Sequence, residues 1–125
     1  MPKPITKPAK SESMAPRKKR VPRGVAGRLR DALLALSQHR AQILDHQERS
    51  WASITFSGTR HRLTLYFMGD DAVEAGEQFI AELPDHEFTL AGQLVAEATV
   101  TEAEHRMAPS PRLVVYCELL LLEEA

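Results

Sequence analysis

The sequence has few of the features that mark secreted or membrane proteins. Cys117 is its single cysteine, so no intrachain disulfide can form and a reducing compartment is the simpler setting. No stretch approaches the ~18 consecutive apolar residues of a membrane-spanning helix. The basic N-terminus also lacks the hydrophobic segment that a secretory signal needs. We therefore predict a cytoplasmic protein with no membrane partner.

The sequence also lacks the short motifs of common catalytic sites. It contains no P-loop and no GxGxxG, GxSxG, HExxH or CxxC pattern, and its glycines are isolated. His39 and His46 are seven residues apart, whereas two metal ligands on one helix are usually about three or four apart. The other histidines, His61, His86 and His105, are scattered. We predict no catalytic residue, no cofactor and no metal site, and we do not expect an enzyme.

Charge is strongly separated along the chain. Residues 1–30 carry ten Lys and Arg against one acid, whereas residues 31–125 carry six bases and sixteen acids. Residues 1–23 also contain five of the eight prolines and few side chains able to bury surface. Such a composition cannot offset the entropy cost of folding. We predict a disordered, basic, Pro-rich arm over residues 1–23 and a single α+β domain over residues 24–125.

The arm contains a dense basic cluster, formed by Arg17, Lys18, Lys19, Arg20 and Arg23. Clustered Lys and Arg displace the condensed counterions of nucleic acids without reading their sequence. Two other interpretations stay open. The cluster is either a solvated tail or a segment that lies on the acidic remainder of the chain or of a neighbour.

Residues 25–48 show an apolar repeat with helical spacing. Leu29, Leu33, Leu36, Arg40, Ile43 and Gln47 recur at alternating intervals of four and three. This spacing places them on one stripe and predicts a single long helix.

Residues 50–69 alternate apolar and polar side chains on both sides of Ser57-Gly58-Thr59. The pattern predicts a β-hairpin that turns at Gly58, because glycine readily adopts the positive φ of tight turns. Basic and aromatic residues share its outer face: Trp51, Arg60, Arg62 and Tyr66. Such a face can stack nucleic-acid bases. The alternative is ordinary cross-strand packing of arginine stems on aromatic rings.

The remaining residues predict one more helix and two more strands. Val73 and Phe79 belong to the apolar face of a helix over residues 71–83, which Pro84 ends. Extended segments follow over residues 88–104 and 112–122. The order α-β-β-α-β-β predicts an α+β fold with a four-stranded, mainly antiparallel sheet packed with helices.

The last predicted strand is apolar on both faces, which is typical of a strand covered on both sides. The helix over residues 71–83 can cover one face. The face around Val114, Tyr116, Leu120 and Leu122 then needs cover from the helix over residues 25–48 or from a second copy of the chain. We predict a homodimer.

Residues 50–125, which include ELPDHEFTLAGQLVAEATV and PRLVVYCELLLLEEA, resemble small uncharacterised proteins of alphaproteobacteria. That group has no assigned activity, so the resemblance implies no functional residues.

Two hypotheses for a small binding or assembly module follow. In the first, the basic arm binds a polyanion such as nucleic acid, and Trp51, Arg60, Arg62 and Tyr66 make secondary contacts. In the second, the folded body is a protein–protein interaction or homodimerisation module with no nucleic-acid role.

Overall fold

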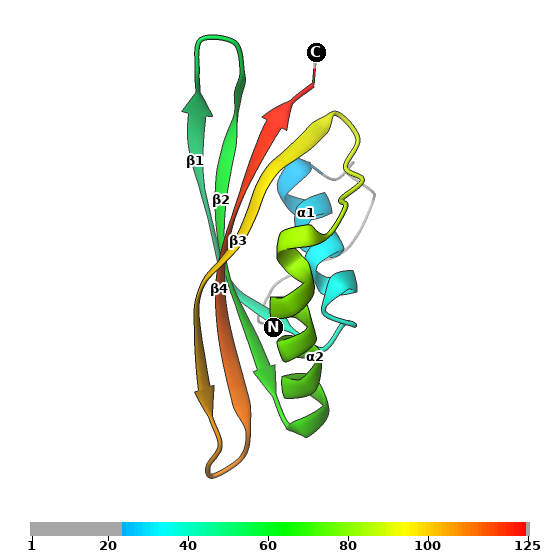
Figure 1. Cartoon of the computed structure of the whole chain (residues 1–125), viewed down its shortest axis with the longest axis vertical. Coiled ribbons are helices and arrows are strands. Elements are labelled where there is room, and N and C mark those ends of the chain that lie inside the picture. Colours follow the sequence, from blue (N-terminus) through cyan, green and yellow to red (C-terminus); the bar gives the residue numbers. More distant parts are fainter. Residues whose placement is uncertain (1–23, 125) are drawn as a thin grey trace, which may run out of the picture.

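The computed structural model describes residues 24–124, and its elements follow the predicted order (Figure 1). The predicted arm lies outside the described residues. The elements are helix α1 (Val25–Leu36), strands β1 (Gln42–Ala52) and β2 (Ser57–Met68), helix α2 (Asp70–Glu82), the 3₁₀ turn η1 (Leu83–Asp85), and strands β3 (Gln93–Arg106) and β4 (Arg112–Glu123). The predicted α+β fold is confirmed.

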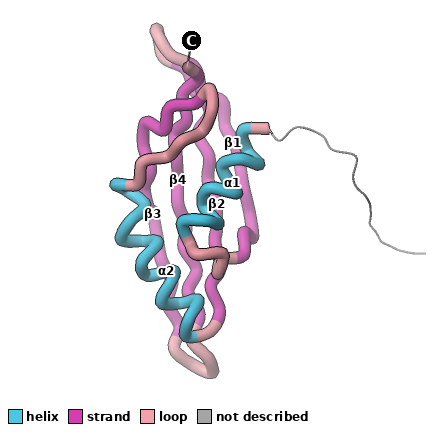
Figure 2. Tube along the Cα trace, turned by 90° about the vertical axis from the view of Figure 1, so that its right-hand side faces the viewer, coloured by secondary structure: helices cyan, strands magenta, loops and turns pink. Residues whose placement is uncertain are grey.

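The four strands form one sheet in the order β1-β2-β4-β3, and every neighbouring pair is antiparallel. Both helices lie on the same face of this sheet (Figure 2). The β1–β2 and β3–β4 hairpins project at opposite ends of the molecule, beyond the length that the helices cover (Figure 1). The other sheet face therefore has no helical cover among residues 24–124.

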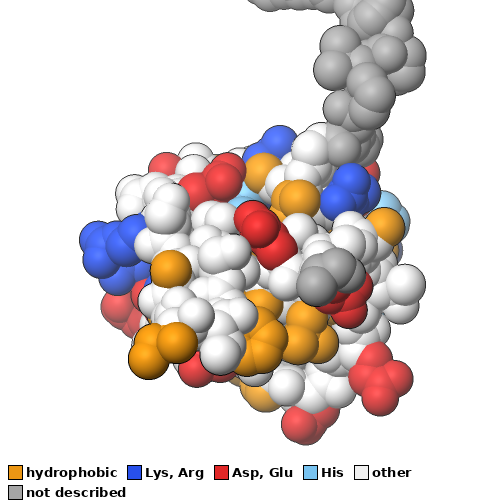
Figure 3. Space-filling model, turned by 90° about the horizontal axis from the view of Figure 1, so that it is seen from above, with side chains coloured by type: hydrophobic (Ala, Val, Ile, Leu, Met, Phe, Trp, Pro, Cys, Tyr) orange, Lys and Arg blue, Asp and Glu red, His pale blue; other side chains and the backbone are white. Residues whose placement is uncertain are grey.

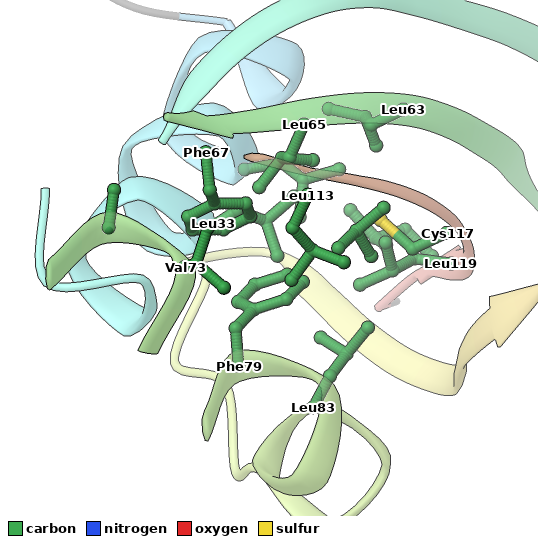
Figure 4. Packing of buried hydrophobic residues seen from close by; sticks show 14 of the residues in the cluster. Leu33, Leu63, Leu65, Phe67, Val73, Phe79, Leu83, Leu113, Cys117 and Leu119 are labelled. Carbon is green, nitrogen blue, oxygen red and sulfur yellow. The ribbon is translucent and has the colours of Figure 1, made fainter. Parts of the chain in front are cut away.

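The core fills the space between the sheet and the two helices (Figure 4). Alternate residues of β2 and β4 point into it because successive side chains of a strand face opposite ways. Leu65, Phe67 and Leu119 are fully buried, as are Leu33 of α1 and Phe79 of α2.

Gly76 allows α2 to lie directly on the sheet. A β-carbon at this position would be 2.8 Å from Cδ2 of Leu113 and 2.9 Å from Cγ of Phe67. Both distances are shorter than carbon atoms tolerate without displacement, so any larger residue would push the helix away from the core.

The prediction of one helix over residues 25–48 is wrong. Helix α1 ends at Leu36, and Gln38 and His39 then adopt left-handed backbone conformations with φ of 60° and 57°. The chain reverses there and continues as edge strand β1. The left-handed region is unfavourable within a helix of L-residues, so two such residues in succession end it.

A bulge explains why strand β1 has the spacing of a helix. Ile43 pairs with Leu65 and His46 pairs with Leu63, while the register shifts between Ile43 and Asp45. The extra residue places Ile43 and His46, three apart in the sequence, on the same sheet face. Three-residue spacing is also what a helix produces, so the pattern alone favoured the wrong element.

The hairpin is confirmed, but its predicted turn is wrong. The chain turns at residues 53–56, where the Ser53 amide donates to the Phe56 carbonyl at 2.8 Å. Gly58 lies within β2 opposite Leu122. A β-carbon there would collide with the Leu121 carbonyl oxygen, so glycine is needed for the close approach of two strands rather than for a turn.

The helix predicted over residues 71–83 and the strand predicted over residues 112–122 correspond to α2 and β4. Within residues 24–124, neither helix has both the length and the apolar character that crossing a bilayer requires.

Candidate functional site

The four hairpin residues predicted to share a surface do share one. Arg60, Arg62 and Tyr66 alternate with the buried residues of β2, so they lie on the helix-free face of the sheet. Trp51 pairs with Gly58 in the same register and faces the same way. The basic cluster over residues 17–23, which this surface was expected to assist, lies outside the described residues.

Acidic partners from the other half of the sheet occupy both arginines. Arg62 Nε donates to a Glu118 carboxylate oxygen at 2.8 Å. Arg60 Nη1 lies 3.2 Å from Glu97 and 3.7 Å from Glu118. A polyanion would have to displace these carboxylates, so the hairpin face is a poor cationic surface.

The Arg60–Glu97 pair also covers the outer face of β4. Leu120 lies between the two, because it pairs with Arg60 of β2 on one side and with Glu97 of β3 on the other. The salt bridge therefore spans Leu120, which is only 5% exposed. Neither α1 nor a second copy is required to cover this residue, because long polar side chains of the neighbouring strands bury it.

Exposed apolar side chains gather at the end of the sheet that carries the β1–β2 turn. Ile54 at the turn is 103% exposed, Phe56 is 52% exposed, and Leu94 at the start of β3 is 51% exposed. The turn holds its shape through the Ser53 hydroxyl, which accepts a hydrogen bond from the Phe56 amide at 3.1 Å. We call this surface the hairpin end.

A shallow hollow lies beside these residues at the same end of the molecule. Phe56, Leu94 and Leu122 supply its apolar wall, and Glu123 and Glu124 border it. Figure 3, which looks down on this end, shows hydrophobic side chains grouped between acidic ones. The hairpin end thus combines a projecting apolar residue, Ile54, with an apolar depression.

Both edges of the sheet carry features that disfavour pairing with another strand. β1 has its bulge next to Ile43, and β3 has register shifts between Val95 and Glu97 and between Val100 and Glu102. Bulges and charged side chains interrupt the regular row of backbone groups that an added strand would need. The edges are therefore less suited to association than the hairpin end.

A second group of polar side chains lies on the helix side of the hairpin. Arg30 Nη1 of α1 is 2.9 Å from His46 Nδ1, and His46 Nε2 is 2.9 Å from His61 Nδ1. His61 is 1% exposed, and its Nε2 has no hydrogen-bond partner among the described residues. Glu48 pairs directly with His61 across the two strands.

The direction of these hydrogen bonds determines where the protons lie. An arginine can only donate, so His46 accepts at Nδ1 and carries its proton on Nε2. That proton is donated to His61 Nδ1, which leaves the proton of His61 on the buried Nε2. Both rings are neutral in this arrangement.

The surroundings of the two rings also favour the neutral form. Burial, and next the Arg30 guanidinium, lower the pKa of His46 below its ordinary 6.5. Burial, and next His46, lower the pKa of His61. Glu48 acts in the opposite direction on both rings, and Asp45 does so on His46, but burial outweighs them.

We therefore expect acid to destabilise the protein through this pair. Below pH 6.5 the unfolded chain takes up protons that the folded His46 and His61 resist. Their contribution is complete above the unfolded pKa and is lost as the pH falls from about 6.5 towards the lower folded values. Urea unfolding at pH 7.5, 6.5 and 5.5, expected to show a falling free energy of unfolding, measures the effect.

His39→Asn is the matched control for this pH dependence. His39 is exposed and has φ of 57°, a conformation that asparagine tolerates, so its pH profile should match the original protein. His46→Gln should flatten the profile around pH 6.5. An equally steep profile in His46→Gln would show that other groups cause the acid sensitivity.

Cys117 lies in the core. It is 1% exposed, and burial, with a smaller effect of Glu118, raises the pKa of its thiol to about 12. A thiol that stays protonated at neutral pH is a poor nucleophile.

No protein-family model matches this sequence, and no curated protein is similar enough to match it. Similar folds do occur among solved structures. A chain in the virion of a native gene transfer agent particle is 15% identical with a TM-score of 0.53, and the alignment covers 80% of this chain and 92% of that one. The two chains share a fold.

A chain of the type 4 fimbrial biogenesis protein PilO from Pseudomonas aeruginosa is 14% identical with a TM-score of 0.41. The alignment covers 79% of this chain and 67% of that chain.

The resemblance of residues 50–125 to small alphaproteobacterial proteins stays a prediction.

Sequence reasoning missed both the hairpin end and the histidine pair. The alternation of Ile54 and Phe56 with polar residues favours a strand, although Ser53 at the start of the turn is a signal for a turn. The helical spacing of residues 25–48 predicts a helix at His46, so the sequence pattern does not reveal that His46 lies beside His61 on the neighbouring strand.

Proposed function

We propose that this protein is an assembly module that associates with a second copy of itself through the hairpin end. The observation that carries the proposal is an apolar projection beside an apolar hollow. Ile54 stands fully exposed next to the depression that Phe56, Leu94 and Leu122 line. A two-fold interface requires a surface that complements itself, and a knob next to a hole meets this requirement.

The helix-free face and the two edge strands are less suited to self-association than the hairpin end. The helix-free face is crossed by the ion pairs of Arg60 and Arg62, and the two edge strands are interrupted by bulges. Burying those charges would carry a desolvation penalty. Burying Ile54, Phe56 and Leu94 removes apolar surface from water and is favourable.

The solved structure of similar fold supports assembly as the class of function. That chain belongs to the virion of a native gene transfer agent particle, and the alignment covers 92% of it. The proposal extends only this general role to the present protein.

A change of Ile54 to aspartate tests the proposal. The original protein should shift from monomer to dimer as its concentration rises, because a patch with three exposed apolar side chains is small beside the ~800 Å² per partner of a standard interface. Ile54→Asp should raise the dissociation constant at least about tenfold, which is about 1.4 kcal/mol. Sedimentation velocity over a concentration series measures both.

Met107→Asp is the matched control, because Met107 is 68% exposed and lies in the β3–β4 connection at the opposite end of the molecule. It should dimerise like the original protein. A monomer at every concentration, or equal losses from Ile54→Asp and Met107→Asp, would contradict the proposal.

Nonspecific polyanion binding is the second candidate, and it rests on the sequence cluster of Arg17, Lys18, Lys19, Arg20 and Arg23. The ion pairs of Arg60 and Arg62 argue against a contribution from the hairpin face. Salt distinguishes the two candidates. Five engaged charges would weaken binding to nucleic acid with a log–log slope of about −4 to −5, whereas an apolar dimer does not weaken with salt.

A further inference from the structure

The histidine pair and a neighbouring carboxylate converge on one point of the sheet. His46 and Glu48 are two residues apart on β1 and therefore face the same way, and Glu48 lies opposite His61 on β2. One nitrogen from each ring and one Glu48 oxygen all lie within 4.8 Å of one another. Two neighbouring strands thus present three potential ligand atoms to a common centre.

The distance between the two imidazole nitrogens is close to that of a bound ion. A tetrahedral zinc ion with bonds of about 2.0–2.1 Å holds two ligating nitrogens about 3.3 Å apart. His46 Nε2 and His61 Nδ1 are already 2.9 Å apart. The ion could bind if the two nitrogens moved apart by a few tenths of an ångström and the exposed Glu48 side chain rotated towards them.

The donor set selects the class of ion. Imidazole nitrogens with a carboxylate oxygen suit zinc and neighbouring divalent transition ions, whereas calcium and magnesium prefer oxygen ligands. We propose that His46 Nε2, His61 Nδ1 and the Glu48 carboxylate form a binding site for a divalent transition ion of the zinc class. Three protein ligands leave a fourth position for water or another donor.

The hydrogen bonding of His61 supports Nδ1 as the ligand atom. His61 is 1% exposed, and its Nε2, the nitrogen that does not face the common centre, has no hydrogen-bond partner among the described residues. The Nδ1 lone pair of His61 already points at the common centre, because the proton of this ring lies on Nε2. Metal binding at Nδ1 requires this tautomer.

Arg30 disfavours metal binding at His46. Its donation to His46 Nδ1 keeps the proton of that ring on Nε2, the atom that must bind the metal. Binding therefore requires Arg30 to turn away and the proton to move to Nδ1. If the site binds a metal, removal of Arg30 should raise its affinity for the ion. If the histidine pair has no metal role, the same change would only delete one hydrogen bond.

Cobalt(II) titration of the full chain, followed by visible absorption, tests this directly, and zinc competition gives the affinity. Arg30→Gln should bind cobalt(II) at least about tenfold more tightly than the original protein. Groups that hydrogen-bond to a metal-binding side chain typically change metal affinity by this amount. Glu48→Gln, at an exposed position that does not endanger folding, should weaken binding by about 100-fold.

His39→Asn, which removes an exposed histidine away from the three ligands, is the control and should bind like the original protein. Far-UV circular dichroism confirms that each variant is folded. No tetrahedral cobalt spectrum in either the original protein or Arg30→Gln would overturn the proposal, and so would affinity that is unchanged in Glu48→Gln.

Discussion

Replacing Gly58 with alanine is expected to lower the free energy of unfolding by about 3 kcal/mol, the upper part of the range for overpacking. The added β-carbon would collide with the Leu121 carbonyl oxygen and lie 2.9 Å from the Leu122 Cα. These are backbone atoms, so no side-chain rotation can relieve the contact, and β2 must separate from β4. For a domain with about 5–15 kcal/mol of total stability, the loss is large.

Gly58→Ala should also disturb the structure around residue 58, in addition to lowering the overall stability. Gly58 pairs with both Trp51 and Leu122, so strand separation there would displace the hairpin end. We expect faster amide hydrogen exchange around residues 57–59 and 120–122, and weaker self-association. Urea unfolding and exchange followed by NMR measure the two effects.

Ser57→Ala provides the comparison for Gly58→Ala. Ser57 is exposed and adjacent to Gly58, and its hydroxyl donates a long hydrogen bond to Glu123 at 3.3 Å. Its replacement should change stability by no more than about 0.5 kcal/mol. If Gly58→Ala were as mild as Ser57→Ala, the close approach of β2 and β4 would be wrong.

Replacing Phe79 with alanine should lower the free energy of unfolding by about 3–5 kcal/mol. Phe79 is fully buried on α2, and its ring lies 6.2 Å from that of Phe67 on the sheet. The change removes most of the contact between helix and sheet at this point and leaves a cavity in a close-packed core. Chemical denaturation gives the magnitude directly.

Phe56→Ala is the matched comparison for Phe79→Ala, because it makes the same change at a residue that is 52% exposed. It should cost less than about 1 kcal/mol of stability but weaken self-association. Phe79→Ala, under conditions where it remains folded, should leave the dissociation constant unchanged. A large stability loss in Phe56→Ala would mean that the hairpin end packs into the core.

The residue pattern was sufficient where one face of an element is deeply buried. Strand β4, whose inward residues such as Val115 and Leu119 are fully buried, and helix α2 around Phe79 were both predicted within one or two residues. Burial on one face imposes a strict period on the apolar residues, and that period is visible in the sequence.

The pattern failed at β1 because an edge strand pairs on one side only and this one contains a bulge. Its apolar signal is weak, and the bulge changes the spacing of Ile43 and His46 from two to three. The candidate sites depend on this strand. His46 and Glu48 meet His61 only through the cross-strand register, which is a contact between distant parts of the chain.

Local periodicity and composition therefore determined the class of fold, the order of its elements and most of its core. The tertiary structure decided the rest: the end of α1, the role of Gly58, the Arg60–Glu97 pair over Leu120, and the convergence of His46, Glu48 and His61. The reason is physical: burial along one element repeats with a short period, whereas the register between strands also depends on turns and bulges that form only in the folded chain.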